Sequence, residues 1–183
     1  MSAQIEKVAH RELVLGGPTI LHTHNLASGS LAQMVYYETG ALQTATNPVI
    51  PYDDTIPQNT EGVQLLALAI TPKAAANKLV ITVCCEIAIA TGIPPFVVIG
   101  SLFRGADVGA ISASCDILAN TNVATSFILR HHMIAGISGQ AITFYFRMGF
   151  SSSNHTLTLN GSGGVRKMGG VMASSMTIEE VVE

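Results

Sequence analysis

The feature that most constrains the fold is a strict alternation of apolar side chains with polar or small ones over residues 142–150. Large apolar residues occupy every second position: Ile142, Phe144, Phe146, Met148 and Phe150. Successive side chains of a β-strand point to opposite faces, so this pattern predicts a strand with one face in a core. Residues 155–160 alternate in the same way, with Leu157 and Leu159 inward. We therefore expect sheets that bury one face and expose the other.

The other apolar segments are short and are bounded by turn-forming residues. Residues 63–70 could form a helix, but their length and the following Thr71-Pro72 favour a buried strand. The segments give about eight strands at roughly 8–12-residue spacing and no convincing helix. We predict an all-β protein, an antiparallel jelly-roll sandwich of about eight strands. Besides residues 140–150 and 155–160, the expected strands are 34–39, 63–70, 78–90, 96–103, 108–114, 123–134 and 172–182.

The chain divides near residue 33. Residues 1–32 contain Gly16-Gly17-Pro18, three of the six histidines and a Ser28-Gly29-Ser30 spacer, a composition typical of an arm or stem. Residues 5–15 could form either a short helix or a strand. We predict an N-terminal attachment arm or stem over residues 1–32 and the jelly-roll domain over residues 33–183.

A proline-rich extended stretch follows the first expected strand. Three prolines lie between residues 47 and 61, which excludes both a helix and a central strand there. Within it, the aspartates of Tyr52-Asp53-Asp54-Thr55 are suited to an Asx-type turn. A catalytic carboxylate pair is the less favoured interpretation of Asp53 and Asp54, because neighbours in an extended chain point apart. We expect the stretch to cross an end of the sandwich or to cover a sheet edge.

The chain is poor in charge. Charged residues make up 11% of it, against about 25% in typical soluble domains. This composition indicates that other protein covers much of the surface. The net charge is −3 and the basic residues are scattered, which argues against a nucleic-acid partner. No apolar run reaches the ~20 residues of a membrane span, and residues 1–10 lack the apolar core of a signal peptide.

Cysteine and histidine side chains often bind metals or take part in catalysis, but here the sequence predicts structural roles for them. The three cysteines, Cys84, Cys85 and Cys115, are predicted to be small buried hydrophobes. His131 and His132 lie in an expected strand, so their rings should face opposite sides of a sheet. For Arg130 and Arg147, ion pairs in an interface and solvated positions on an outer face are equally open.

A glycine-rich segment near the C-terminus invites comparison with a phosphate-binding loop. Residues 161–167 hold three glycines followed by Arg166-Lys167, but the spacing to a Lys-Ser/Thr pair is wrong. We predict a hairpin-like loop instead. The glycosylation sequons at Asn154 and Asn160 carry little weight without a secretory signal.

Two segments resemble a known family. Residues 50–62 read IPYDDTIPQNTEG and are followed by the segments 68–72 and 77–79, and residues 169–180 read GGVMASSMTIEE. They are similar to the jelly-roll domain at the C-terminus of tail-fibre and host-specificity proteins on the virion surface of tailed phages. Phe103-Arg104 and residues 157–161 also fit this pattern, so the resemblance covers about residues 34–183.

The resemblance implies a homotrimer of sandwiches around a threefold axis, similar in outline to tumour-necrosis-factor-like modules. It implies a non-enzymatic structural protein of a bacteriophage virion, a trimeric surface subunit such as a tail-fibre tip or short spike that contacts the host. The expected partners are further copies of the chain, other virion proteins and a host cell-surface receptor, with neither nucleic acid nor membrane insertion. The expected location is the virion, after assembly in the host cytoplasm.

A trimer would also give the arm a candidate metal site. His22 and His24 are two positions apart, so in an extended chain they face the same side. Three such pairs around the axis would present six imidazoles, which suits an octahedral transition metal such as iron. The alternative is a solvated arm whose histidines bind nothing. No other cofactor is expected.

Other functions remain as alternatives. Only about thirty residues precede the domain, which argues against a long fibre and suits a capsid decoration or cement protein that binds the head lattice through its N-terminal arm. A fibre tip would instead present the loops 90–95, 105–109 and 160–170 together at one end. A secreted trimeric ligand resembling C1q or tumour necrosis factor would need the signal peptide that is missing. A glycan-cleaving enzyme would need a clustered acid pair.

Overall fold

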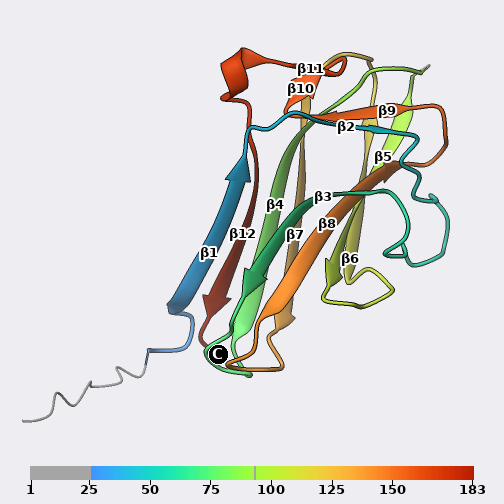
Figure 1. Cartoon of the computed structure of the whole chain (residues 1–183). Coiled ribbons are helices and arrows are strands. Elements are labelled where there is room, and N and C mark those ends of the chain that lie inside the picture. Colours follow the sequence, from blue (N-terminus) through green and yellow to red (C-terminus); the bar gives the residue numbers. More distant parts are fainter. Residues whose placement is uncertain (1–25, 93) are drawn as a thin grey trace, which may run out of the picture.

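Strands provide almost all of the regular structure in residues 26–92 and 94–183, which are the residues that the computed structural model describes (Figure 1). Its one short helix is the 3-10 turn η1 (Met168–Gly170). No described helix is long and apolar enough to span a membrane. The strands are β1 (Leu31–Thr39), β2 (Gln43–Thr46), β3 (Val63–Ile70), β4 (Lys78–Ile89), β5 (Phe96–Arg104), β6 (Ser112–Leu118), β7 (Thr125–Ile134), β8 (Ile142–Phe150), β9 (Thr156–Leu159), β10 (Gly161–Ser162), β11 (Val165–Arg166) and β12 (Ser174–Val181).

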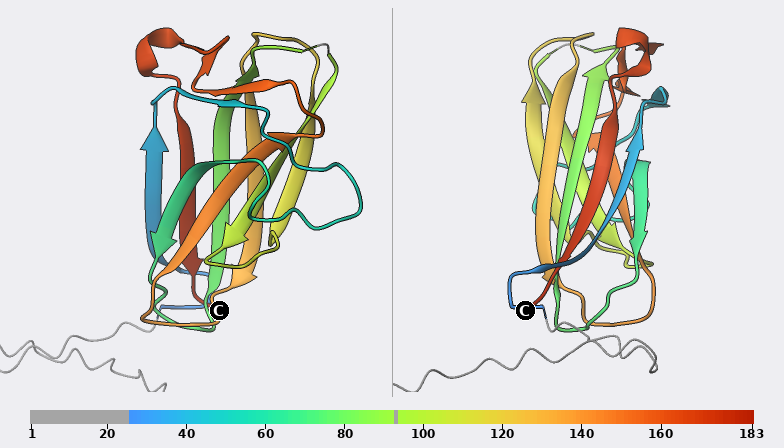
Figure 2. Two further views of the ribbon diagram at one scale, coloured as in Figure 1. Left: turned by 45° about the vertical axis from the view of Figure 1, so that its right-hand side comes forward. Right: turned by 90° about the vertical axis from the view of Figure 1, so that its left-hand side faces the viewer.

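The strands form two layers that pack face to face (Figure 2). The six-stranded sheet has the order β1-β12-β4-β9-β2, and β7 pairs with the other edge of β4. The four-stranded sheet has the order β3-β8-β5-β6, and β10 and β11 form a separate small hairpin. The long β4 holds the six-stranded sheet together. It pairs with β7 along one edge, and with β12 and then β9 along the other.

The pairing pattern defines the fold. Among the eight long strands, the first pairs with the last (β1 with β12), the second with the seventh (β3 with β8), the third with the sixth (β4 with β7) and the fourth with the fifth (β5 with β6), all antiparallel. This is a double strand folded over into two sheets, which is a jelly roll. The predicted fold class is therefore confirmed.

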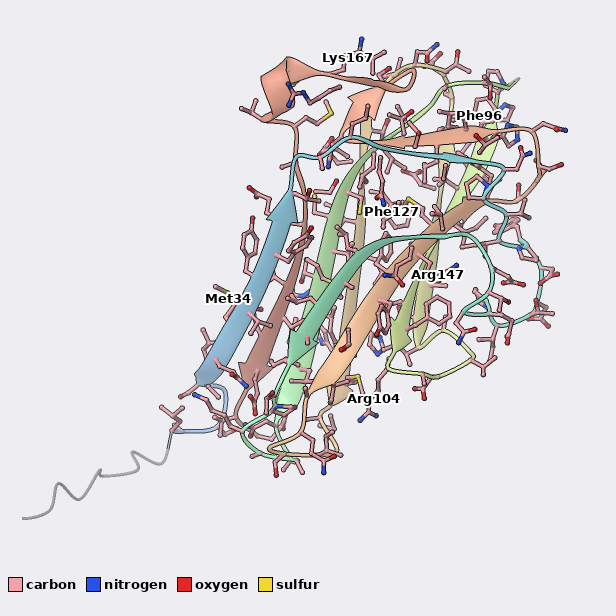
Figure 3. The ribbon with its side chains drawn as sticks, in the orientation of Figure 1. Met34, Phe96, Arg104, Phe127, Arg147 and Lys167 are labelled. Carbon is pink, nitrogen blue, oxygen red and sulfur yellow. The ribbon has the colours of Figure 1, made fainter. Side chains whose placement is uncertain are left out.

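The core lies between the two sheets, where the alternating side chains meet. Phe144, Phe146 and Met148 of β8 are fully buried, and from the opposite sheet they face the inward residues of β4. Phe127 of β7, labelled in Figure 3, packs on Phe146 with its ring centroid 6.0 Å away. The alternation over residues 142–150 therefore correctly predicts a strand whose apolar face lies in the core of the sandwich.

The expected strands match the observed ones closely, with one shift. The segment 63–70 is the strand β3 and not a helix. The strand expected at residues 108–114 begins later, at Ser112, because the preceding residues bridge to the loop before β3 through Gln58 and Gly109. β1 already begins at Leu31, near the proposed domain boundary, and the arm itself lies mostly outside the described residues.

The proline-rich stretch lies against the four-stranded sheet. Its start pairs with the end of β8 through a bridge between Val49 and Phe150, and Ile50 is fully buried against Gly149. At its end, the Arg147 side chain donates to the carbonyls of Glu61 and Gly62. The stretch is extended, as its prolines predict, and it lies beside the end of β8 and the loop before β6, where Gln58 bridges to Gly109.

A buried carboxylate ties one end of the sandwich together. Glu180 of β12 is fully buried and accepts hydrogen bonds from the backbone N–H groups of Lys73 and Ala74. It also accepts from the side-chain amides of Asn77, at 2.7 Å, and Gln33. Burial opposes ionisation of Glu180, but these hydrogen bonds outweigh it and lower the pKa of the carboxyl. The bonds hold the β3–β4 turn against β1 and β12.

Candidate functional surfaces

The residues singled out for metal or acid–base chemistry lie partly outside and partly inside the described structure. His22 and His24 lie outside the described residues, so the arm's metal site stays a prediction. Residues 26–92 and 94–183 hold no group of three or more histidine, cysteine or acidic residues able to bind a metal. Asp53 accepts from the backbone N–H of Thr55 at 2.9 Å and from its hydroxyl, which confirms the Asx turn and lowers the Asp53 pKa.

The cysteines differ in exposure. Cys85 is fully buried in the core, and burial raises the pKa of its thiol to about 12. Cys84 is half-buried on the opposite side of β4. Cys115, however, is exposed. The prediction that all three are buried is wrong for Cys115 because β6 is an edge strand whose outer residues meet solvent.

The histidine pair and the glycine-rich segment have the structural roles expected of them. His132 is exposed on the outside of β7, whereas His131 points inward, where burial followed by the charge of His132 lowers its pKa. Residues 161–166 form the β10–β11 hairpin. Asn160, just before it, is fully buried and donates to the carbonyls of Thr39 and Ala41, so its sequon is inaccessible in the folded chain.

The loops that a fibre tip would present together at one end are split between both ends. The start of the 90–95 segment lies beside the 160–170 segment, since Ala90 and Thr91 line one hollow with Ser162 and Val165. The 105–109 turn lies at the opposite end (Figure 1). The expectation is wrong on this point because β5 runs the full length of the sandwich between the first loop and that turn.

The outward side of the six-stranded sheet is a broad, partly apolar surface, which we call the β1–β7 face. Exposed apolar side chains stand at both margins, with Met34 54% and Tyr36 53% exposed on β1, and Ile128 63% exposed on β7. Figure 3 shows Met34 pointing away from the sandwich. The register places these residues beside Ser175, Thr177 and Glu179 of β12, Val80, Thr82 and Cys84 of β4, and Arg130 and His132 of β7.

Both acidic and basic side chains lie on this face. Glu38 and Glu179 lie on β1 and β12, whereas Arg130 and His132 lie on β7. The Tyr36 hydroxyl donates to Glu38, and this hydrogen bond raises the Tyr36 pKa. Arg130 has no ion-pair partner within the described part of the chain, where the one ion pair joins Lys78 and Glu183. The β1 margin of the face is therefore acidic, while the β7 side carries Arg130 together with Glu86 of β4, which accepts a hydrogen bond from Ser126 of β7.

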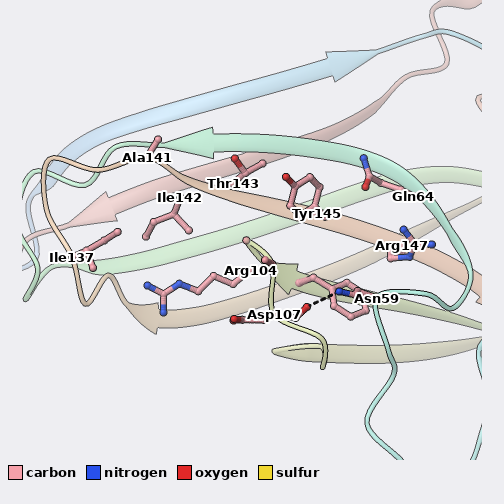
Figure 4. Close-up of a pocket in the computed structure, with 13 residues that line it drawn as sticks. Asn59, Gln64, Arg104, Asp107, Ile137, Ala141, Ile142, Thr143, Tyr145 and Arg147 are labelled. Carbon is pink, nitrogen blue, oxygen red and sulfur yellow. Dashed lines mark hydrogen bonds between the residues drawn. The ribbon is translucent and has the colours of Figure 1, made fainter.

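A groove lies on the other side of the molecule, outside the four-stranded sheet. It has a volume of about 770 Å³ and is lined by β8, by the turn after β5 and by the end of the proline-rich stretch. Figure 4 shows Thr143, Tyr145 and Arg147 on β8, while Arg104, which pairs with the inward Phe144, donates to the carbonyl of Ala135 just after β7 at 3.1 Å. Asn59 donates to the Asp107 carbonyl at 3.1 Å and joins the two loops that flank the groove.

Sequence reasoning found only part of this groove. The alternation of residues 142–150 places Thr143, Tyr145 and Arg147 on one face, but it does not indicate a groove. Arg147 donates to the carbonyls of Glu61 and Gly62 and makes no ion pair within the described residues, so an ion pair with another subunit stays a prediction for it. Asn59 and Asp107 come from loops, and no periodic signal marks them.

Comparison with known proteins gives structural likenesses only. No family model matches the chain, and no curated protein matches it. Among solved structures, the chain is similar to the C-terminal domain of EclA, a sugar-binding protein, with a TM-score of 0.34, 18% identity and coverage of 77% of this chain and 83% of that chain. It is also similar to the VP2 protein of infectious bursal disease virus, with a TM-score of 0.38, 14% identity and coverage of 84% of this chain and 39% of that chain.

A third likeness is to the subunit of Bacillus endospore appendages, which are disulfide-linked pili. The TM-score is 0.30 at 15% identity, and the match covers 87% of this chain and 99% of that chain. The similar structures thus include viral capsid and sugar-binding β-domains, while the chain spans well under half of the VP2 chain.

Proposed function

We propose that this chain is a non-enzymatic structural subunit of a bacteriophage particle, which acts as a homotrimer on the virion surface and takes part in contact with the host. The observation that carries the proposal is the β1–β7 face. It exposes Met34, Tyr36 and Ile128 in a chain with only 11% charged residues, and exposed apolar surface of this kind is typical of protein interfaces. The likeness of residues 50–62 and 169–180 to phage virion domains supports the phage assignment.

The charges on the β1–β7 face favour a ring over a twofold dimer. Glu38 and Glu179 lie on β1 and β12, and Arg130 lies on β7, so a contact that pairs Arg130 with one of these acids joins different sides of two subunits. Such heterologous contacts close into rings when the rotation permits. Three subunits, as the resemblance implies, would bring Arg130 of each subunit to the acidic side of the next.

The oligomer is tested by sedimentation at micromolar concentration with charge-reversal variants. The wild type should sediment as a trimer, and Ile128→Glu and Arg130→Glu should dissociate it, because each places a carboxylate in the contact. Combining Arg130→Glu with either Glu179→Arg or Glu38→Arg should restore the trimer for at least one pair. The matched control is Arg166→Glu, which lies on the β10–β11 hairpin away from the face. A monomeric wild type would overturn the proposed trimer.

The location on a particle requires a separate experiment. Gold-labelled antibodies against the folded domain should decorate phage particles in electron micrographs, at the tail for a fibre tip or spike. Decoration of the head would favour the cement role instead. Particles without label, produced by cells that synthesise the chain, would contradict the virion assignment.

A further inference from the structure

One end of the sandwich carries basic residues and no acidic ones. The strand register brings together there the links β1–β2, β4–β5, β6–β7 and β8–β9 and the whole segment from β9 to β12, and we call this the β10–β11 end. None of the 12 acidic residues of the chain lies in these segments, whereas Arg166 and Lys167 do. The acidic residues that come next, Glu38, Glu86 and Asp116, lie within strands. The β10–β11 end is therefore positive on a chain whose net charge is −3.

The β10–β11 end also exposes the most solvent-accessible large apolar side chains of the described residues. Val171 is 83% exposed and Met168 is 71% exposed, while Val165 is 58% exposed. Val165 and Met168 line one hollow of about 790 Å³ together with Lys167, which Figure 3 labels at this end of the molecule. Apolar and cationic side chains therefore lie side by side on one surface.

Nothing within the fold favours a methionine at position 168. The φ angle of Met168 is +51°, in the left-handed region that glycine and asparagine adopt most readily. The turn η1, to which Met168 belongs, buries none of its residues. The side chain therefore gains neither packing nor a favourable backbone from the fold, and a contact outside the chain accounts for a large apolar residue here.

The β10–β11 end is held in place by hydrogen bonds between its segments. Asn160 donates to the carbonyls of Thr39 and Ala41 at 2.8 and 3.0 Å. The Ser162 hydroxyl donates to the Asn122 carbonyl at 2.6 Å, and the Asn122 backbone N–H donates to β4. The surface is therefore formed before any partner arrives, which lowers the entropy cost of binding.

The combination of charge and apolar surface selects the partner. A second copy of the β10–β11 end would oppose Arg166 and Lys167 of two chains with no acidic residue to pair them, and such like-charge contacts are unfavourable. A soluble polyanion would pair with the cations but would leave Met168 and Val171 in water. A membrane surface with anionic headgroups satisfies both, because apolar side chains reach the boundary between headgroups and acyl chains while Lys and Arg meet lipid phosphates.

We propose that the β10–β11 end binds the surface of a membrane rich in anionic phospholipid, with Met168 and Val171 entering the headgroup region and Arg166 and Lys167 contacting lipid phosphates. The contact is peripheral and needs no membrane-spanning segment. The inference deepens the proposed host contact and rests on it for its biological setting. Rotation about a threefold axis places the three β10–β11 ends of the proposed trimer at the same height, so they can engage one membrane together and gain avidity.

The proposal is tested on the purified full chain by flotation with vesicles. The probes are vesicles of equimolar phosphatidylglycerol and phosphatidylcholine, vesicles of phosphatidylcholine alone, and soluble polygalacturonate measured by titration calorimetry. We expect the chain to float with the anionic vesicles, less so as salt is raised, and not to bind the neutral vesicles or the polygalacturonate. Lys167→Glu should weaken vesicle binding roughly 10-fold or more, and Met168→Asn should weaken it roughly 10-fold through lost apolar burial.

Three variants separate membrane binding from folding and assembly. Asparagine tolerates a positive φ, so Met168→Asn should keep the unfolding midpoint of the wild type. The matched control is Val108→Asn, which removes an apolar side chain that is 62% exposed on the turn at the opposite end and should leave flotation unchanged. Lys167→Arg keeps the charge and should retain binding.

Four results would each overturn the proposal: no flotation with anionic vesicles, equal flotation with neutral vesicles, an equal loss in Met168→Asn and Val108→Asn, or binding of polygalacturonate in place of vesicles. Sedimentation reports the oligomer separately. Arg166→Glu, which should remain a trimer, should lose vesicle binding, and a wild-type trimer that binds no vesicles refutes this inference and leaves the proposed function standing.

Discussion

At the scale of single residues, Glu180 connects segments that lie far apart in the sequence. Asn77 precedes β4 and Glu180 lies in β12, and the two side chains meet in a hydrogen bond that is buried. The contact has a physical reason, since a buried carboxylate is stable only with donors around it. The sequence offered no sign of this contact, because 103 positions separate the two residues.

Glu180→Gln should destabilise the fold by roughly 2–3 kcal/mol near pH 7, because the bonds to a charged acceptor are lost. The folded-state pKa of Glu180 is lowered, so its contribution is fully present above the unfolded-state pKa and is lost as pH falls through the folded value. Urea unfolding at fixed protein concentration should show the two proteins converging as the solution is acidified. A difference that stays constant down to the lowest pH would contradict the role of the charge.

Gly100 shows a constraint that no pattern reveals. A Cβ atom at this position would lie 2.5 Å from Cε1 of Phe127 and 2.7 Å from Cζ of Phe146, so the two rings fill the space of the missing side chain. Gly100→Ala should cost about 1–3 kcal/mol by overpacking. Gly109→Ala is the matched control, since its Cβ would meet only the Ile56 side chain, at 3.2 Å. Equal unfolding midpoints for the two variants would show that the core accommodates the added methyl group at position 100 without loss of stability.

At the scale of elements, the sequence predicts strands well where one face is buried. The alternation over residues 142–150 gives β8 directly, and the short apolar segments give most of the other strands. β2 escapes prediction because its residues Gln43–Thr46 have no apolar alternation and pair only with the short β9. Register and sheet order could not be predicted, since they depend on contacts between distant strands.

The residues of the candidate surfaces could likewise be predicted only where they lie on strands. Strand residues such as Tyr145 and Arg147 could be assigned to a shared face from their spacing. The loop residues that complete the groove could not, because their positions depend on how the proline-rich stretch lies against β8. Exposure of Cys115 was missed for a related reason, since only the sheet order shows that β6 is an edge strand.

At the scale of the whole molecule, the rates at which the cysteine thiols react can report on assembly. If the chain forms the proposed trimer, a thiol-specific reagent should modify Cys115 quickly, Cys84 slowly and Cys85 not at all. Burial and then the charge of Glu86 raise the Cys84 pKa, and the β1–β7 face would cover this thiol. In the Ile128→Glu variant, Cys84 should react faster while Cys115 is unchanged, as measured by mass spectrometry of modified peptides. Equal Cys84 rates in both proteins would place the contact elsewhere.

The described chain enters and leaves the sandwich at the same end. Gly29 donates to the Val182 carbonyl at 2.7 Å, and Val182 donates back to Ser30 at 2.9 Å, so the two ends of the domain lie side by side (Figure 1). This gives the domain a polarity, with a base where both ends emerge and a crown formed by the β10–β11 hairpin and the 90–95 loop. A protein fused to either end would sit at the base, which makes the crown the natural place to graft a new recognition loop.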